Sequence, residues 1–274
     1  VISVRGVVLP ISAVRGRIPR SRADEARGEA GVMLRAIFFD IDNTLFSTRE
    51  FARRARAASV EAMIQAGLRI DAPTLIAELD EVVREFSSNY ERHFDKLLLR
   101  LPRRVTRGLN PSLIVAAGMV AYHQTKFRHL EPFEDAYEVL RRLARTELVR
   151  GIITEGLEVK QAEKLVRLKV HEFLTPHAIF ISHQIGISKP NPKLYQRACG
   201  DLNLKPSECM YVGDQPALDI DPANSIGMVT VRILREGHNR DVRGESEPDF
   251  EVENFWDLME ILTARYEVQV PEVI

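Results

Sequence analysis

Four short segments of the sequence carry side chains that could hold a phosphate group beside a metal ion. Asp40 and Asp42 directly follow an apolar run, and Asp214 and Asp219 follow another. Carboxylates that meet at one point repel one another unless a cation joins them. Such all-oxygen ligands suit a hard ion such as Mg²⁺. One aspartate beside that ion can attack phosphorus, and a second one two residues further on can transfer protons.

The other two segments carry a hydroxyl group and a lysine. Thr154 is followed by Glu155, and Lys189 lies between Ser188 and Pro190. A threonine hydroxyl and a lysine ammonium group suit the oxygens of a phosphate. The chain has 8 lysines against 30 arginines, so a lysine in such a position stands out from the background.

Ligands of an open α/β sheet gather at the carboxyl ends of its strands, so the apolar runs before these segments decide where the side chains meet. The runs that predict strands are 34–39, 149–153, 178–182, 209–212 and 228–233. The segments between them that predict helices are 133–145, 157–168, 193–201 and 217–225. This alternation indicates βαβ units with right-handed crossovers. We therefore predict an α/β fold with a Rossmann-like parallel sheet flanked by helices.

The stretch between the first two strands has no strand signal and predicts only helices. The predicted helices are 49–67, 73–90, 91–100 and 112–127. We therefore expect an all-helical domain of residues 49–130, inserted into a core domain formed by residues 33–48 and 131–274. Residues 1–32 are rich in arginine and small residues, and we expect them to be an N-terminal extension with little ordered structure.

The composition restricts the class of protein. A hydrophobic fraction of 45% and a charged fraction of 28% are typical of a soluble globular chain. The longest stretch without charged residues, 108–125, is interrupted by polar residues and is no membrane span. Two cysteines cannot make a disulfide framework, which favours the cytoplasm. With 38 basic and 39 acidic residues, we expect neither nucleic acid nor a membrane as partner, and a monomer or homodimer.

The four segments, in this order, resemble the motifs of the haloacid dehalogenase (HAD) superfamily. The resemblance covers about residues 33–262, and the helical insertion occupies the place of this family's cap domain. The matching residues are Asp40, Asp42 and Thr44 in the first motif, Thr154 in the second, Lys189 in the third, and Gly213, Asp214 and Asp219 in the fourth.

The resemblance implies a role for each matching residue. Asp40 would be the nucleophile that becomes phosphorylated, and Asp42 would protonate the leaving alcohol and then activate water. Thr154 and Lys189 would hold the phosphoryl group. Glu155 would lie beside that group, which is unfavourable for an acid unless it turns away or pairs with a cation.

The resemblance also implies a metal site and a class of substrate. Mg²⁺ would be bound by the carboxylates of Asp40 and Asp214 and by the backbone carbonyl of Asp42, with Asp219 in support. The expected activity is that of a phosphatase, which would hydrolyse a small phosphomonoester through an aspartyl-phosphate. The pieces 121–123 and 126–127 resemble an archaeal branch of HAD phosphatases, which implies a sugar or triose phosphate as the small phosphorylated metabolite.

The choice of substrate is expected to rest with the inserted domain, because the core reads only phosphate. Polar and aromatic groups gather there in two stretches, which could equally be a solvated face. The candidate specificity residues are Asn89, Tyr90, His93, His123 and Lys126.

Two other functions fit parts of the pattern. A C–halogen hydrolase would need neither Asp42 nor the metal acids Asp214 and Asp219. A non-catalytic phospho-accepting module, such as a receiver domain, would be shorter and would carry its metal acids on the first strand. The order of the motifs and the helical insertion favour the phosphatase.

Overall fold

A computed structural model describes residues 33–87, 90–235 and 239–270 of the chain. The expected N-terminal extension and the candidate residue Asn89 lie outside these described residues. Within them, every helix is too short or too polar to cross a membrane.

The core is one parallel six-stranded sheet with the strand order β3-β2-β1-β4-β5-β6. The first strand of the chain, β1, lies in the middle and pairs in parallel with β2 on one side and β4 on the other. The carboxyl ends of these strands therefore meet at one edge, as the sequence predicted. The strands are β1 (Ala36–Phe39), β2 (Val149–Thr154), β3 (Ile179–Ile181), β4 (Cys209–Gly213), β5 (Val229–Ile233) and β6 (Phe250–Val252).

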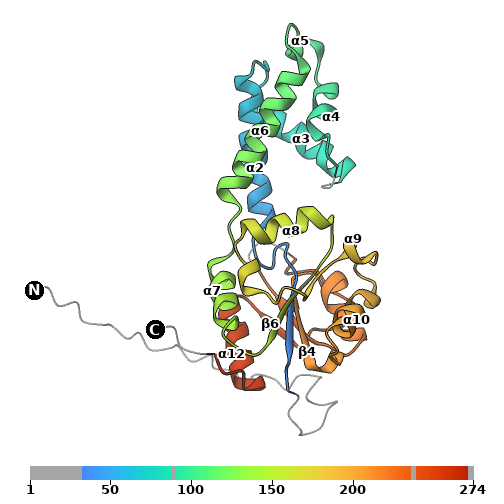
Figure 1. The fold of residues 1–274 in the computed structure, drawn as a ribbon. Helices are drawn as coiled ribbons and strands as arrows, with labels where there is room; N and C mark the ends of the chain where they lie inside the picture. The colour runs from blue at the N-terminus through green and yellow to red at the C-terminus, as the bar shows by residue number, and fades with distance from the viewer. Residues whose placement is uncertain (1–32, 88–89, 236–238, 271–274) are drawn as a thin grey trace, which may run out of the picture.

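Helices cover both faces of the sheet. On β1, Ile37 and Phe39 point into one apolar cluster, whereas Ala36 and Phe38 point into another. This period of two is the geometry of a strand buried on both faces. Figure 1 shows α7 and α12 on one side of the sheet and α10 on the other. The flanking helices are α7 (Glu134–Leu143), α8 (Glu158–Arg167), α10 (Pro192–Asp201), α11 (Asp221–Ser225) and α12 (Phe255–Tyr266).

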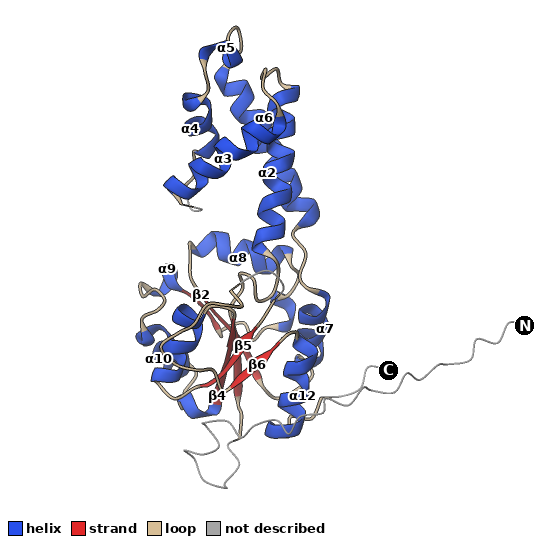
Figure 2. Cartoon of the chain, turned by 180° about the vertical axis from the view of Figure 1, so that it is seen from behind, coloured by secondary structure: helices blue, strands red, loops and turns tan. Residues whose placement is uncertain are grey.

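The insertion after β1 is entirely helical and has an apolar core of its own. Its long first helix begins after Ser47, whose side chain accepts a hydrogen bond from the Glu50 amide at 3.1 Å. Buried residues such as Val60, Met63 and Leu79 form a cluster separate from those of the sheet. Figure 2 shows this bundle above the sheet, with α8 at its base. Its helices are α2 (Thr48–Gln65), α3 (Ala72–Phe86), α4 (His93–Arg100), α5 (Arg103–Thr106) and α6 (Pro111–His129).

The predicted fold class is confirmed, but several elements differ from the prediction. The helix expected to reach residue 90 ends at Phe86, because Ser87 turns the backbone to a left-handed φ of 66°. The expected helix 217–225 is a π-helical segment, η3 (Pro216–Ile220), followed by the short α11. No element was predicted after residue 233, where β6 has only three residues. The helix α12 had a signal, because Asn254 caps it by accepting from the Asp257 amide at 3.0 Å.

Candidate active site

The turn after β1 fixes the first aspartate pair. The Asp40 amide donates to the Val212 carbonyl at 2.9 Å, which extends the β1–β4 pairing by one residue. Asn43 then takes a left-handed φ of 57°, a conformation that asparagine tolerates. Its side-chain oxygen accepts from the amide and hydroxyl of Thr48 at 3.1 and 2.7 Å. The chain therefore leaves the sheet in a turn that holds both carboxylates at the strand edge.

Lys189 lies at the centre of a buried charged cluster. Its Nζ is 2.7 Å from Oδ1 of Asp40 and 2.7 Å from Oδ1 of Asp219. It also lies 2.7 Å from the hydroxyl of Tyr211, which donates in turn to the Ile153 carbonyl at 2.9 Å. Burial opposes the charge on Lys189, yet Asp219 and Asp40 raise its pKa well above its usual value. The lysine is therefore a fixed cation at the sheet edge.

The spacing of the fourth motif has a steric reason. The Asp219 carboxylate folds back over β4, where Oδ2 accepts from the Gln215 amide at 2.9 Å. A Cβ atom at Gly213 would lie 2.5 Å from the Asp219 carboxyl carbon. Only glycine therefore allows this acid, carried on the π-helical η3, to reach the cluster.

Three of the predicted metal-binding acids come together. Asp40, Asp214 and Asp219 are buried, and each offers a carboxylate oxygen within 4.8 Å of the others. Desolvation by burial, together with the charges of Asp219 and Asp40, raises the pKa of Asp214 to about 8. Burial likewise raises the pKa of Asp40 to about 6, although Lys189 opposes the rise. Three acids beside one lysine leave excess negative charge, so this oxygen-only donor set fits a hard divalent cation.

The carboxylate of Asp42 lies apart from this cluster and is held by helix α8. Lys164 Nζ lies 2.6 and 2.7 Å from its two carboxylate oxygens. Gln161 Nε2 donates to the same carboxylate at 3.2 Å. The two aspartates of the first motif thus have different partners, and the Asp42 carboxylate is not among the three acids that come together.

Gln161 also joins the second motif to this arrangement. The buried Thr154 hydroxyl accepts from Gln161 Nε2 at 3.2 Å, and the same nitrogen donates to the Glu155 carbonyl. The sequence analysis missed both Gln161 and Lys164. The scarcity of lysine and the position of Lys164 in the helix after the second motif were the available signal.

The Glu155 side chain is exposed and turns to a neighbouring loop. Its Oε1 accepts from the Ser188 hydroxyl at 3.1 Å. This contact gives the carboxylate a neutral donor at the residue preceding Lys189. Its predicted place among the phosphate ligands stays a prediction.

The described candidate specificity residues make contacts within the insertion or to α8. The Tyr90 ring stacks on Phe86 and meets His93 edge-on, and His93 Nε2 lies 2.8 Å from the Ser87 carbonyl. Lys126 forms an ion pair with Glu163 of α8. The structure therefore does not bring these residues together in one cluster, and their part in substrate choice stays a prediction.

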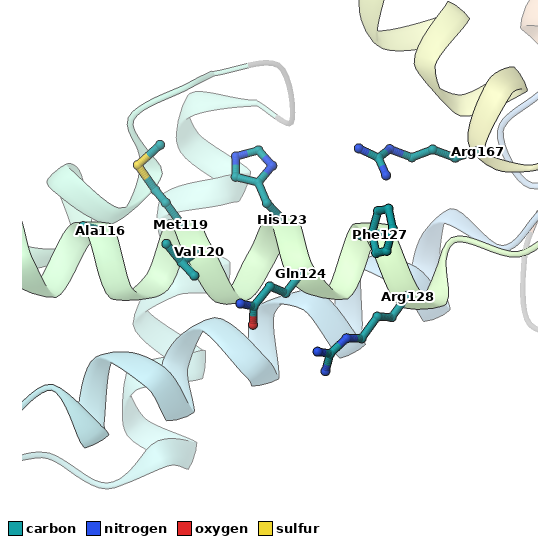
Figure 3. A pocket seen from close by; sticks show the side chains of 8 residues that line it. All are labelled: Ala116, Met119, Val120, His123, Gln124, Phe127, Arg128 and Arg167. Atoms are coloured by element: carbon teal, nitrogen blue, oxygen red, sulfur yellow. The ribbon is translucent and has the colours of Figure 1, made fainter.

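His123 lines an open hollow along α6. Figure 3 shows Met119, His123 and Phe127 on one side of the helix, with Arg167 of α8 facing Phe127. The hollow has a volume of about 650 Å³, and none of its lining residues belongs to the carboxylate cluster. It is thus a separate feature of the border between α6 and α8.

Comparison with known sequences decides the family. Residues 34–227 match the family of haloacid dehalogenase-like hydrolases. The chain belongs to this family. The glyceraldehyde 3-phosphate phosphatase of Methanopyrus kandleri is 44% identical over 235 residues, which cover 84% of this chain and 97% of that protein. The glyceraldehyde 3-phosphate phosphatase of Methanocaldococcus jannaschii is 34% identical over 230 residues, with coverages of 84% and 97%.

Solved structures share the fold. A HAD phosphatase from Thermococcus onnurineus aligns with a TM-score of 0.60 and 21% identity, and covers 84% of this chain and 98% of its own. A 2-haloacid dehalogenase from Pseudomonas syringae aligns with a TM-score of 0.57 and 21% identity, with coverages of 85% and 99%. Since the same fold carries both activities, the reaction has to be argued from the side chains of the site.

Proposed function

We propose that this HAD-family hydrolase is a Mg²⁺-dependent phosphatase that hydrolyses a small phosphomonoester through an aspartyl-phosphate on Asp40. The observation that carries the proposal is the separation of the two motif-one aspartates. Asp40 lies in a buried cluster with Lys189 and further acids, whereas Asp42 lies beside it with its carboxylate outside that cluster. Asp40 would attack the phosphorus atom, and Asp42 would move protons.

Asp40 would attack the phosphorus atom in line with the departing oxygen. Lys189 holds Oδ1 of Asp40 and would lie against an oxygen of the phosphoryl group. The Thr154 hydroxyl, oriented by Gln161, would donate to another oxygen. Phosphoryl transfer depends mainly on positioning and on neutralising charge, which these fixed donors provide.

Asp42, in its protonated form, would give that proton to the leaving alcohol oxygen as the ester bond breaks. As a carboxylate, it would then accept a proton from the water that attacks the phosphorus of the aspartyl-phosphate. The bond between phosphorus and the Asp40 oxygen would break, which would release phosphate and restore Asp40. Both steps need a carboxyl group that no metal binds, and the position of the Asp42 carboxylate outside the cluster of three acids supports this role.

The metal would be held by the carboxylates of Asp40 and Asp214 and the backbone carbonyl of Asp42, with Asp219 in support. Bound there, Mg²⁺ would offset the charge of the acids and of the phosphate oxygens. Burial and the neighbouring carboxylates raise the pKa values of Asp40 and Asp214, and a bound cation would stabilise the charged form of both acids.

Two alternatives are less well supported by the same residues. A C–halogen hydrolase has no use for Asp42 or for a cluster of three metal acids. A phospho-accepting module would not need a helical insertion over its site. Residues 49–130 would instead act as a cap that excludes water, hinged near 47–48 and 131–132.

The relatives indicate which ester to test first. Two glyceraldehyde 3-phosphate phosphatases match this chain over nearly their whole length. A triose phosphate is therefore the proposed substrate. The proposed location is the cytoplasm, where such metabolites occur and where the two free cysteines would stay reduced. The oligomeric state, monomer or homodimer, stays a prediction.

A panel of phosphomonoesters, assayed for phosphate release with Mg²⁺ and with EDTA, tests the proposal. We expect Mg²⁺-dependent release, with small sugar and triose phosphates among the best esters. Full activity after EDTA treatment would contradict the metal, and absence of release from every ester would contradict the phosphatase.

A further inference from the structure

Helix α8 presents two polar side chains to the site on one of its faces. Gln161 and Lys164 are three residues apart, so they lie next to each other on the helix surface. Gln161 is buried and Lys164 is 21% exposed, so neither is an ordinary surface residue. Both reach the carboxylate of Asp42, which lies more than a hundred residues earlier in the chain.

The contact between Lys164 and Asp42 is strong and directional. Nζ lies within 2.7 Å of both carboxylate oxygens, which is the distance of a charge-assisted hydrogen bond. The ammonium group also lies 5.7 Å from the ring centre of Phe46, which restricts it on a further side. A carboxylate held at both oxygens cannot rotate freely, so Lys164 sets the direction in which Asp42 points.

Taken with the proposed function, these contacts lead to a role for the lysine. We propose that Lys164 is a positioning residue that orients Asp42 for proton transfer to and from the reacting oxygens. It acts through Asp42 and not through the phosphate, because Lys189 already supplies the cation at Asp40. Gln161 supports the same orientation and ties it to Thr154.

The leaving group of the substrate gives a readout that a purely structural role would not change. An alkyl alkoxide is a poor leaving group and needs the proton of Asp42, whereas an aryl oxide leaves without much help. The ratio kcat/KM reports on the steps up to formation of the aspartyl-phosphate. Lys164→Met should therefore lower kcat/KM for an alkyl phosphate by about 10²-fold, and for an aryl phosphate by much less. Lys164→Arg should recover part of the alkyl activity.

A double-mutant cycle tests whether Lys164 works through Asp42. In an Asp42→Asn background, Lys164→Met should cause little further loss on the alkyl phosphate. Lys160→Met is the matched control, since Lys160 lies one turn earlier on α8 and pairs with Glu91 of the insertion. We expect Lys160→Met to leave the alkyl-to-aryl ratio unchanged. Equal losses from Lys164→Met on both esters, or in both backgrounds, would overturn the inference.

Crystal structures of the wild type and Lys164→Met give an independent test without turnover. The Asp42 carboxylate should rotate away from its wild-type direction in the variant, and an unchanged carboxylate would overturn the inference. If the carboxylate rotates while the wild type hydrolyses no phosphomonoester, the positioning role stands and the proposed function fails.

Discussion

The buried cluster at the sheet edge and the contacts between α8 and the helical insertion both consist of ion pairs, but they differ in exposure. In the cluster, the side chains of Lys189 and Asp219 are 2% exposed and that of Asp40 is 9% exposed. At the insertion, Lys126 is 15% exposed and Glu163 is 33% exposed, and the pair of Lys160 and Glu91 is more open still.

This difference in exposure implies a difference in how easily the pairs separate. Breaking a buried pair leaves an uncompensated charge in a medium of low polarity, at about 3–5 kcal/mol. A partly exposed pair is replaced by water at about 0–1 kcal/mol. We therefore expect the buried cluster to stay rigid and the insertion to separate from α8 more easily, as the proposed role of a cap over a phosphate site would require.

The largest effect should come from the cluster. We expect Asp40→Asn to lower turnover of any phosphomonoester by about 10⁴-fold or more, because an amide is a poor nucleophile and removes a metal-binding charge. Phosphate release from an aryl phosphate measures it. Asp201→Asn is the control, since Asp201 pairs with Arg197 on the exposed side of α10. Comparable turnover by Asp40→Asn would show that another residue is the nucleophile.

Filling the space beside the backbone at Gly213 should disturb the same cluster without removing a charge. In Gly213→Ala, the new Cβ would lie 2.5 Å from the Asp219 carboxyl carbon, so the acid must shift away from Lys189. We expect lower Mg²⁺ affinity, and a free energy of unfolding reduced by about 1–3 kcal/mol.

Gly200→Ala is the matched control for that change. Gly200 lies in α10, and a Cβ there meets nothing within 4 Å. Alanine should raise the free energy of unfolding by up to about 1 kcal/mol. Equal effects at the two glycines, measured by urea unfolding, would show that Asp219 does not depend on the space at Gly213.

The pKa values of the cluster predict how stability depends on pH in the metal-free protein. Asp214, raised to about 8, and Asp40, raised to about 6, keep protons in the folded state that the unfolded chain loses near 4. The folded state thus binds more protons in this window, so the free energy of unfolding should fall as the pH rises from about 4 to 8.

Mg²⁺ should oppose that fall in stability with rising pH. The ion replaces the protons, so its stabilising effect on the Tm should be larger at about pH 8 than at about pH 5. Binding at neutral pH should release protons, which calorimetry in two buffers of different ionisation enthalpy detects. A Tm that rises with pH in EDTA would contradict the raised pKa values.

The contrast between cluster and insertion also explains how much the sequence could predict. Asp40 and Asp214 directly follow buried strands whose register fixes where they meet. Lys189 joins them from the loop after β3 and α9 (Ser182–Ile185). The motifs and the predicted fold therefore indicated the same site. The position of Gly213 was predicted, but its steric reason needed the π-helical turn that brings Asp219 back over β4.

The contacts of the α8 residues could not be predicted from the sequence, for a physical reason. Lys164 reaches Asp42 across more than a hundred residues, so its place after the second motif could mark the lysine but could not name its partner. In the insertion, Lys126 was predicted to be a specificity residue because it is polar. Its ion pair with Glu163 depends on how the helical bundle packs against α8. Packing between separately formed cores decides such contacts, and it leaves little trace in the local sequence pattern.

The smallest effect should come from the pair at the insertion. We expect Lys126→Met to lower kcat/KM for the triose phosphate by about fivefold, the equivalent of about 1 kcal/mol for a partly exposed pair. An aryl phosphate should be affected less, since its easy leaving group needs only the core residues. Glu163→Gln should give a similar change, and the double variant should lose no more than either single one.

Two controls separate this pair from the remaining features of the insertion. Lys96→Met alters the insertion's other lysine, whose ammonium group lies over the Phe86 ring within the insertion, so kcat/KM should not change for either ester. His123→Ala alters the hollow along α6 but leaves the ion pair in place. A loss for His123→Ala on the triose phosphate alone would make His123 a specificity residue. Equal losses on both esters would indicate a role in folding. No loss in any variant would show that Lys126 and His123 are ordinary solvated residues without a part in substrate choice.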